Sequence, residues 1–241
     1  MTIPGSVLAR RLSFELKSVA STHPAVAIPI ARLRHGVVVG QGTEVVIEGF
    51  PRTGTSFAVS AFRRAQARRV DIACHVHAPA QILEGVRRRL PTLVVVREPA
   101  ETVISFAVRN HHLALSQALR GFARFYEAVI PVLDGVVVAD FAEVTQCLDR
   151  SIGRVNGRFG TSFVPFSHTD DEVRAVFAEI DEDYARRVHG ESFERAVARP
   201  SEARDALKQK IRSRYWAPSL AALRTRAELA YDGIARGADA R

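Results

Sequence analysis

Residues 43–69 read TEVVIEGFPRTGTSFAVSAFRRAQARR, and the order of residue types in this stretch decides the fold. The nearly continuous apolar run over 43–50 predicts a buried β-strand. PRTGTS at 51–56 predicts a tight turn, because proline, glycine and hydroxyl residues favour turns. FAVSAFRRAQARR at 57–69 predicts a helix with a basic far end. The stretch therefore predicts a strand–loop–helix unit.

Strands and helices alternate further along the chain. Further strands are predicted at 70–74, 92–97 and 135–141, and helices at about 80–89, from Pro99 onward and at about 113–130. Such alternation is typical of a parallel sheet with helices on both faces. We therefore predict an α/β fold with a central parallel sheet flanked by helices and a helical C-terminal part.

The chain length of 241 residues predicts a single domain over 1–241. An amphipathic helix is expected at 6–20, followed by an irregular lead-in over 21–43 that is punctuated by proline and glycine. Residues 43–141 are expected to form the core of the domain. The remaining part, 142–241, is expected to be mainly helical, with helices at 169–187 and 201–235.

The charge balance indicates an anionic partner. Lysine and arginine total 34 against 26 acidic residues, which gives a formal net charge of +8 and a pI near 10.3. A nucleotide, a nucleic acid or an anionic membrane surface would each suit that charge. Cys74 and Cys147 sit among apolar residues, which favours reduced thiols in a cytoplasmic protein. No apolar run approaches the ~20 residues of a membrane span, and no signal peptide is expected.

The turn at 51–56 has the composition of an anion-binding loop. A helix N-terminus carries unpaired N–H groups and a positive dipole, so an anion is stabilised there. Gly49 and Gly54 allow the backbone to approach a ligand closely, and Arg52 adds a permanent cation suited to phosphate or sulfate oxygens. Hydroxyl donors are added by Thr53, Thr55 and Ser56. The alternative is an ordinary helix-cap turn, since serine and threonine also cap helices.

Comparison with a Walker A loop disfavours, but leaves open, a P-loop kinase or NTPase that uses ATP. In that loop a lysine follows the second glycine and reaches the terminal phosphates. Here no lysine follows Gly54, and the predicted strand 92–97 ends in Arg97 where an acidic residue would hold magnesium. A non-catalytic basic module that binds nucleic acid through arginine clusters, such as 63–69 and 87–89, is a third possibility.

Three stretches resemble motifs of the sulfotransferase family, and they occur in the family's order. GFPRTGTSF at 49–57 resembles its phosphosulfate-binding loop. VVVREPAETVISF at 94–106 is similar to its 3′-phosphate motif, with Ser105 eight positions after Arg97. HVHAP at 75–79 is similar to the family's K-T-H-x-P segment, whose histidine is the catalytic base.

The resemblance implies a P-loop NTPase-like sulfotransferase fold and a function. Family members transfer a sulfonate from 3′-phosphoadenosine 5′-phosphosulfate, their co-substrate, to an acceptor hydroxyl or amine, and no metal is expected. The implied catalytic residues are Arg52, which stabilises charge, and His77, the base. The implied co-substrate-binding residues are Pro51, Arg52, Thr53, Gly54, Thr55, Ser56, Phe57, Arg97 and Ser105.

Several alternatives stay open from the sequence alone. His75 could serve as the base in place of His77, since both lie on one side of an extended segment. Phe57 could stack on adenine or be the first core residue of its helix. A metal site at Cys74, His75 and His77 lacks obvious remaining ligands. Residues 208–216 could cover the nucleotide or form an exposed helix face.

The acceptor and the oligomeric state carry no signature in this sequence. The segments that would build an acceptor pocket, about 110–130 and 142–235, contain no recognisable motif. We expect a small-molecule, carbohydrate or lipid acceptor and no nucleic-acid partner.

Overall fold

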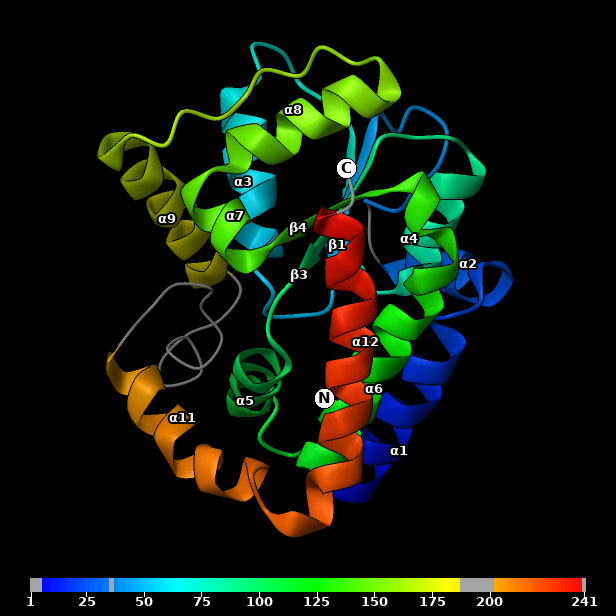
Figure 1. The fold of residues 1–241 in the computed structure, drawn as a ribbon, viewed down its shortest axis with the longest axis vertical. Helices are drawn as coiled ribbons and strands as arrows, with labels where there is room; N and C mark the ends of the chain where they lie inside the picture. Colours follow the sequence, from blue (N-terminus) through cyan, green and yellow to red (C-terminus); the bar gives the residue numbers. More distant parts are fainter. Residues whose placement is uncertain (1–5, 35–36, 187–201, 240–241) are drawn as a thin grey trace.

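Figure 1 shows the fold in a computed structural model, which describes residues 6–34, 37–186 and 202–239. Its sheet has four parallel strands in the spatial order β2-β1-β3-β4. They are β1 (Val45–Gly49), β2 (Ile72–Cys74), β3 (Thr92–Val96) and β4 (Val137–Asp140). The parallel sheet with helices on both faces confirms the predicted α/β class, and each strand is shorter than its predicted run.

The strands are apolar along their length because both faces of the sheet are covered. Side chains alternate between the faces, so Val45 and Ile47 point to one core cluster while Val46 points to another. Helices on the first face are α3 (Thr55–Ala65), α7 (Phe141–Gln146), α8 (Leu148–Phe159) and α9 (Asp170–Ala185). Those on the opposite face are α4 (Pro79–Arg87), α5 (Pro99–Arg109), α6 (Leu115–Val129) and α12 (Ala221–Asp239).

Two helical predictions need correction. The expected irregular lead-in contains the helix α2 (Pro24–Arg34), in which Pro24 lies in the first turn, where a missing N–H costs little. Burial of Ala27, Ile28 and Ala31 then stabilises this helix despite Pro29 in its interior. The single helix expected at 201–235 is divided into α11 (Glu202–Tyr215), a short 3₁₀ turn (Pro218–Leu220) and α12. Residues 187–201 of the expected helical part lie outside the described residues.

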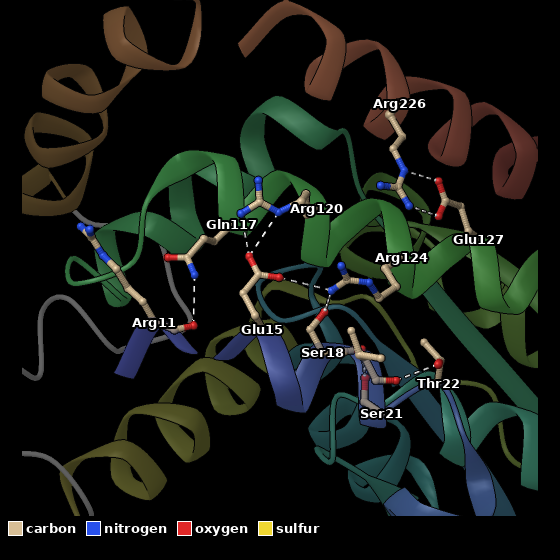
Figure 2. Close-up of polar contacts among 11 residues, drawn as sticks. Arg11, Glu15, Ser18, Ser21, Thr22, Gln117, Arg120, Arg124, Glu127 and Arg226 are labelled. Carbon is tan, nitrogen blue, oxygen red and sulfur yellow. Dashed lines mark hydrogen bonds and ion pairs between the residues drawn. The ribbon is translucent and has the colours of Figure 1, made fainter. Parts of the chain in front are cut away.

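The N-terminal helix α1 (Val7–Ala20) packs along α6 through close contact and charge pairing. Figure 2 shows Glu15 between two arginines of α6, at 2.7 Å from Arg120 and 3.6 Å from Arg124. The ring of Phe14 lies over Gly121, where an added Cβ would come within 2.9 Å of it. A second 3₁₀ segment (Ile130–Gly135) joins α6 to β4. None of the described helices is long and apolar enough to cross a bilayer.

A buried tyrosine fixes the backbone at the carboxyl end of β1. The Phe50 N–H donates to the Tyr126 hydroxyl at 3.3 Å, and that hydroxyl donates to the Val95 carbonyl at 2.8 Å. Gly49 lies so close to β3 that an added Cβ would collide with the Val95 carbonyl oxygen and approach Thr53 Oγ1 to 2.7 Å. Backbone of a central strand cannot retreat without breaking the sheet, so this position requires glycine.

We predict that Gly49→Ala lowers the free energy of unfolding by about 2–4 kcal/mol, because the collision falls on backbone atoms. Denaturant unfolding followed by circular dichroism measures the change. Gly153→Ala is the matched control, since nothing lies within 4 Å of a Cβ there. In the middle of α8 that alanine should stabilise the protein by about 0.5–1 kcal/mol. Equal stability of the two variants would contradict the packing constraint at Gly49.

Candidate functional site

The strand order creates a crevice at one edge of the sheet. The connection after β1 runs through α3 to β2 on one side, whereas the connection after β3 runs through α5 and α6 to β4 on the other. In open parallel sheets, ligands bind beyond the carboxyl ends of the strands where the connections diverge in this way. Both predicted anion-binding loops, after Gly49 and after Val96, leave the sheet at this point.

A cavity of about 200 Å³ lies at this crevice, and the structure brings nearly all of the predicted site residues together around it. Thr53 is the one predicted member that does not line the cavity. Those that do are Pro51, Arg52, Gly54, Thr55, Ser56, Phe57, His77, Arg97 and Ser105. Pockets that enclose a whole small-molecule ligand are roughly 300–1,000 Å³. The cavity therefore has room for only part of a ligand of that size.

The backbone around the cavity is held in rarely populated conformations. Arg52 has φ 78°, His75 φ 62° and His77 φ 53°, all in the left-handed region that side chains with a Cβ avoid. Gly54, which precedes α3, has φ 98°. Strained residues of this kind cost about 1–3 kcal/mol each and gather at functional sites. These residues lie just beyond the carboxyl ends of β1 and β2, at the same edge of the sheet as the cavity.

Two arginines, which follow the neighbouring strands β1 and β3, both line the cavity. Arg52 donates from Nε to the Ser105 hydroxyl at 3.1 Å. Arg97 lies 3.5 Å from the Arg52 carbonyl oxygen and stacks on the ring of Phe141, with 3.9 Å from its guanidinium carbon to the ring centroid. Ser105, which sequence reasoning grouped with Arg97, thus also contacts the loop after β1.

The Arg97 guanidinium is poorly hydrated. Its side chain is 20% exposed, and its ion pair with Glu101 is long at 3.6 Å. Burial lowers the pKa of Arg97 while Glu101 opposes that shift, and the group keeps its charge. Glu101 is shared with Arg212 of α11, which approaches it to 2.7 Å. A desolvated cation with a weak partner attracts an additional anion strongly.

His77 is set up as a proton acceptor. Its Nδ1 lies 2.9 Å from the Gly49 carbonyl oxygen, which can only accept, so Nδ1 carries the hydrogen. Burial lowers the pKa of His77 to about 4, so the imidazole is neutral at pH 7 and its Nε2 has a free lone pair. His75, the alternative base, is 5.9 Å away between ring centroids and does not line the cavity. The geometry favours His77.

The remaining predicted residues of the loop make contacts within the loop and with the core. Thr53 Oγ1 donates to the Phe50 carbonyl at 2.8 Å and contacts Thr55 Oγ1 at 3.2 Å. Both hydroxyls are buried, so hydrogen bonds inside the loop occupy them. Phe57 is 3% exposed, and its ring packs against Phe166 and Phe177. This packing favours the core role of Phe57 over stacking on adenine.

Sequence reasoning missed several residues that line the cavity. Arg109 donates to the Tyr184 hydroxyl at 3.2 Å, and Lys208 pairs with Asp205 at 2.7 Å. Arg109 could have been found from its spacing, because it lies four residues after Ser105 and thus on the same face of α5. Lys208 belongs to the basic stretch 208–216, for which the sequence allows either a cover for the nucleotide or an exposed helix face. Tyr184 and Asp205 carry no local signal.

A buried carboxyl behind the histidine segment was also missed. Glu48 of β1 is fully buried, and neither of its oxygens has a hydrogen bond of normal geometry. Burial raises the pKa of Glu48 to about 8, and the N–H groups of residues 75–78, which face the carboxyl, only partly oppose that shift. The carboxyl is therefore largely protonated at neutral pH.

The adjoining thiol of Cys74 is almost completely buried. Burial, together with the charge of Glu48, raises its pKa to about 12. In the part of the chain that the structure describes, no three His, Cys, Asp or Glu side chains gather as a metal-ligand group.

No protein-family model and no curated protein matches this chain. The assignment of function therefore rests on the geometry of the site and on the three motifs.

We predict that Glu48→Gln removes a pH-dependent loss of stability. A carboxyl whose pKa rises from 4.5 to about 8 on folding contributes fully below pH 4.5, and that contribution is lost as the pH rises toward 8. The variant should gain on the wild type by up to about 1.4 kcal/mol per pH unit across this window. Thermal unfolding at pH 5, 6, 7 and 8 measures the difference. The exposed carboxylate variant Glu182→Gln should show no such trend, and a flat difference for Glu48→Gln would refute its buried protonation.

Proposed function

We propose that this protein is a sulfotransferase that transfers a sulfonate from 3′-phosphoadenosine 5′-phosphosulfate to the hydroxyl of an acceptor. The observation that supports this function best is the convergence of Arg52 and Arg97, from adjacent strand exits, on one cavity that His77 also lines. The motif resemblance assigns these three residues to the two anionic ends of that donor and to the base.

The phosphosulfate end fits the loop after β1. Arg52 provides a permanent cation there, and no side chain caps the N-terminus of α3. The first N–H groups of that helix add a positive dipole to the same side of the cavity. In a group transfer with a loose transition state, charge stabilisation and alignment carry most of the catalysis.

The 3′-phosphate, which distinguishes this donor from ATP, fits the exit of β3. Arg97 is a partly desolvated cation, and the N-terminus of α5 beside it also lacks a side-chain cap. Arg109 adds further positive charge to the cavity wall, whereas the charge of Lys208 there is paired with Asp205. A site with cations at two separate positions holds an adenosine compound with anionic groups at both its 3′ and 5′ ends better than one with a single anionic end.

In this transfer the acceptor oxygen bonds to sulfur while the bond from sulfur to the bridging phosphate oxygen breaks, and that oxygen keeps the electron pair. His77 takes the acceptor proton on Nε2 as the new bond forms. Its Nδ1–H bond to Gly49 fixes the ring and the tautomer. The positive charges of Arg52 and Arg109 help to lower the pKa of free His77, and an anion bound beside them would reverse that effect.

We predict that the protein binds adenosine 3′,5′-bisphosphate in preference to AMP and ATP. Arg97→Ala should weaken binding of the bisphosphate by about 10–100-fold and binding of AMP little, since a charge-assisted hydrogen bond contributes about 1.5–3 kcal/mol. Calorimetric titration of each nucleotide measures both effects. Arg69→Ala, which removes the same charge from an exposed site, is the control. Equal binding of the three nucleotides by the wild type would refute the sulfotransferase proposal, and preference for ATP would favour a kinase.

We predict that His77→Ala lowers the rate of sulfonate transfer by about 10²–10⁴-fold, as expected for loss of a general base, while the affinity for the bisphosphate stays nearly unchanged. Transfer of a radiolabelled sulfonate to a panel of phenols, alkanols and sugars measures the rate. His75→Ala is the matched control and should retain activity. The reverse pattern, with activity lost in His75→Ala and kept in His77→Ala, would show that the wrong histidine has been assigned.

A further inference from the structure

A second cavity adjoins the first and shares residues with it. Its volume is about 290 Å³, and it lies between the N-terminal helices α1 and α2 and the middle of α6. Pro51 and His77 line both cavities. The base assigned above therefore stands at the boundary between a basic cavity and a second space that none of the three sulfotransferase motifs predicts.

The wall of the second cavity is predominantly apolar. Four phenylalanines contribute to it, together with aliphatic residues of α2 such as Ile30 and Ala31. The rings pack on one another, with centroid separations of 5.1 Å for Phe50–Phe106 and 6.0 Å for Phe50–Phe125. The four rings are those of Phe14, Phe50, Phe106 and Phe125.

The cavity offers few polar partners. Among the residues that the structure describes, no acidic side chain lines it, and Lys17 contributes a cation to its wall. The Ser21 hydroxyl donates to the Ser18 carbonyl at 2.9 Å, so it is engaged within the helix end. A sugar bound here would lose hydration from several hydroxyls without replacement hydrogen bonds, and the burial of each such group is unfavourable. An apolar body would gain free energy on entering instead.

From this arrangement we infer that the acceptor is an alcohol or phenol with an apolar body, which occupies the second cavity and presents its hydroxyl to His77. The inference rests on the proposed function and narrows it. The acceptor hydroxyl must reach both the base and the transferred group, and the boundary at His77 and Pro51 is where the apolar cavity meets the basic one. The apolar body then lies on the side away from Arg52 and Arg97.

The first test is a series of primary alkanols from ethanol to octanol as acceptors. The value of kcat/KM should rise about four-fold per methylene until the cavity is filled, because each buried methylene contributes about 0.8 kcal/mol. Glucose should be a poor acceptor. A flat dependence on chain length, or glucose as the better acceptor, would overturn the inference.

The second test is a binding measurement that needs no turnover. Fluorescence titration with 2-naphthol, in the presence of adenosine 3′,5′-bisphosphate, should show at least five-fold weaker binding to Ile30→Asp than to the wild type. Val26→Asp is the matched control, since it lies one turn earlier on α2, has similar exposure (47% against 45%) and does not line the cavity. Equal weakening in both variants, or in neither, would contradict binding of the probe in this cavity.

The two proposals fail in different ways. If the wild type binds the bisphosphate but shows neither the chain-length dependence nor the Ile30→Asp effect, the apolar acceptor is wrong and the sulfotransferase proposal stands. If the bisphosphate does not bind, both proposals fail, whatever 2-naphthol does. Calorimetric titration of Ile30→Asp with the bisphosphate should match the wild type, because Ile30 does not line the first cavity.

Discussion

The hydrogen bonds at the exit of β1 fix the geometry on which the candidate site depends. The Tyr126 hydroxyl joins the backbone of Phe50 to that of Val95, and the Gly49 carbonyl receives the hydrogen of His77. The ends of β1 and β3 are thereby bound to each other and to the segment that follows β2. Because Gly49 has no side chain, these backbones approach closely enough for one cavity to receive groups from all three strands.

Much of the fold follows from the sequence because its determinants are local. Apolar runs without alternation indicate strands covered on both faces, and all four are found in the sheet. The helix α2 escaped prediction because Pro24 and Pro29 suggest a break, whereas burial of one face of this helix outweighs that local preference. The division of the C-terminal helical part at Pro218 depends likewise on how α12 returns to pack against α6.

The candidate site likewise contains residues that the sequence predicts and residues that only tertiary packing reveals. Arg52, His77 and Arg97 could be predicted because each lies in a loop that directly follows a strand. Tyr184 and Lys208 reach the cavity from helices distant in sequence, so only tertiary packing reveals them. Residue type alone could not show that the Thr53 hydroxyl turns inward to a backbone carbonyl or that Glu48 is buried with no hydrogen bond of normal geometry to its oxygens.

The buried thiol of Cys74 allows opening of the edge strand β2 to be followed by chemical modification. Burial raises the pKa of Cys74 to about 12, so its sulfur is protonated at pH 7, and the closed fold shields it from reagents. Alkylation by iodoacetamide therefore requires β2 to separate from β1. The rate of modification of this sulfur reports how often β2, the strand that precedes His75 and His77, opens. A ligand that binds at the carboxyl ends of the strands and stabilises the closed sheet slows that reaction.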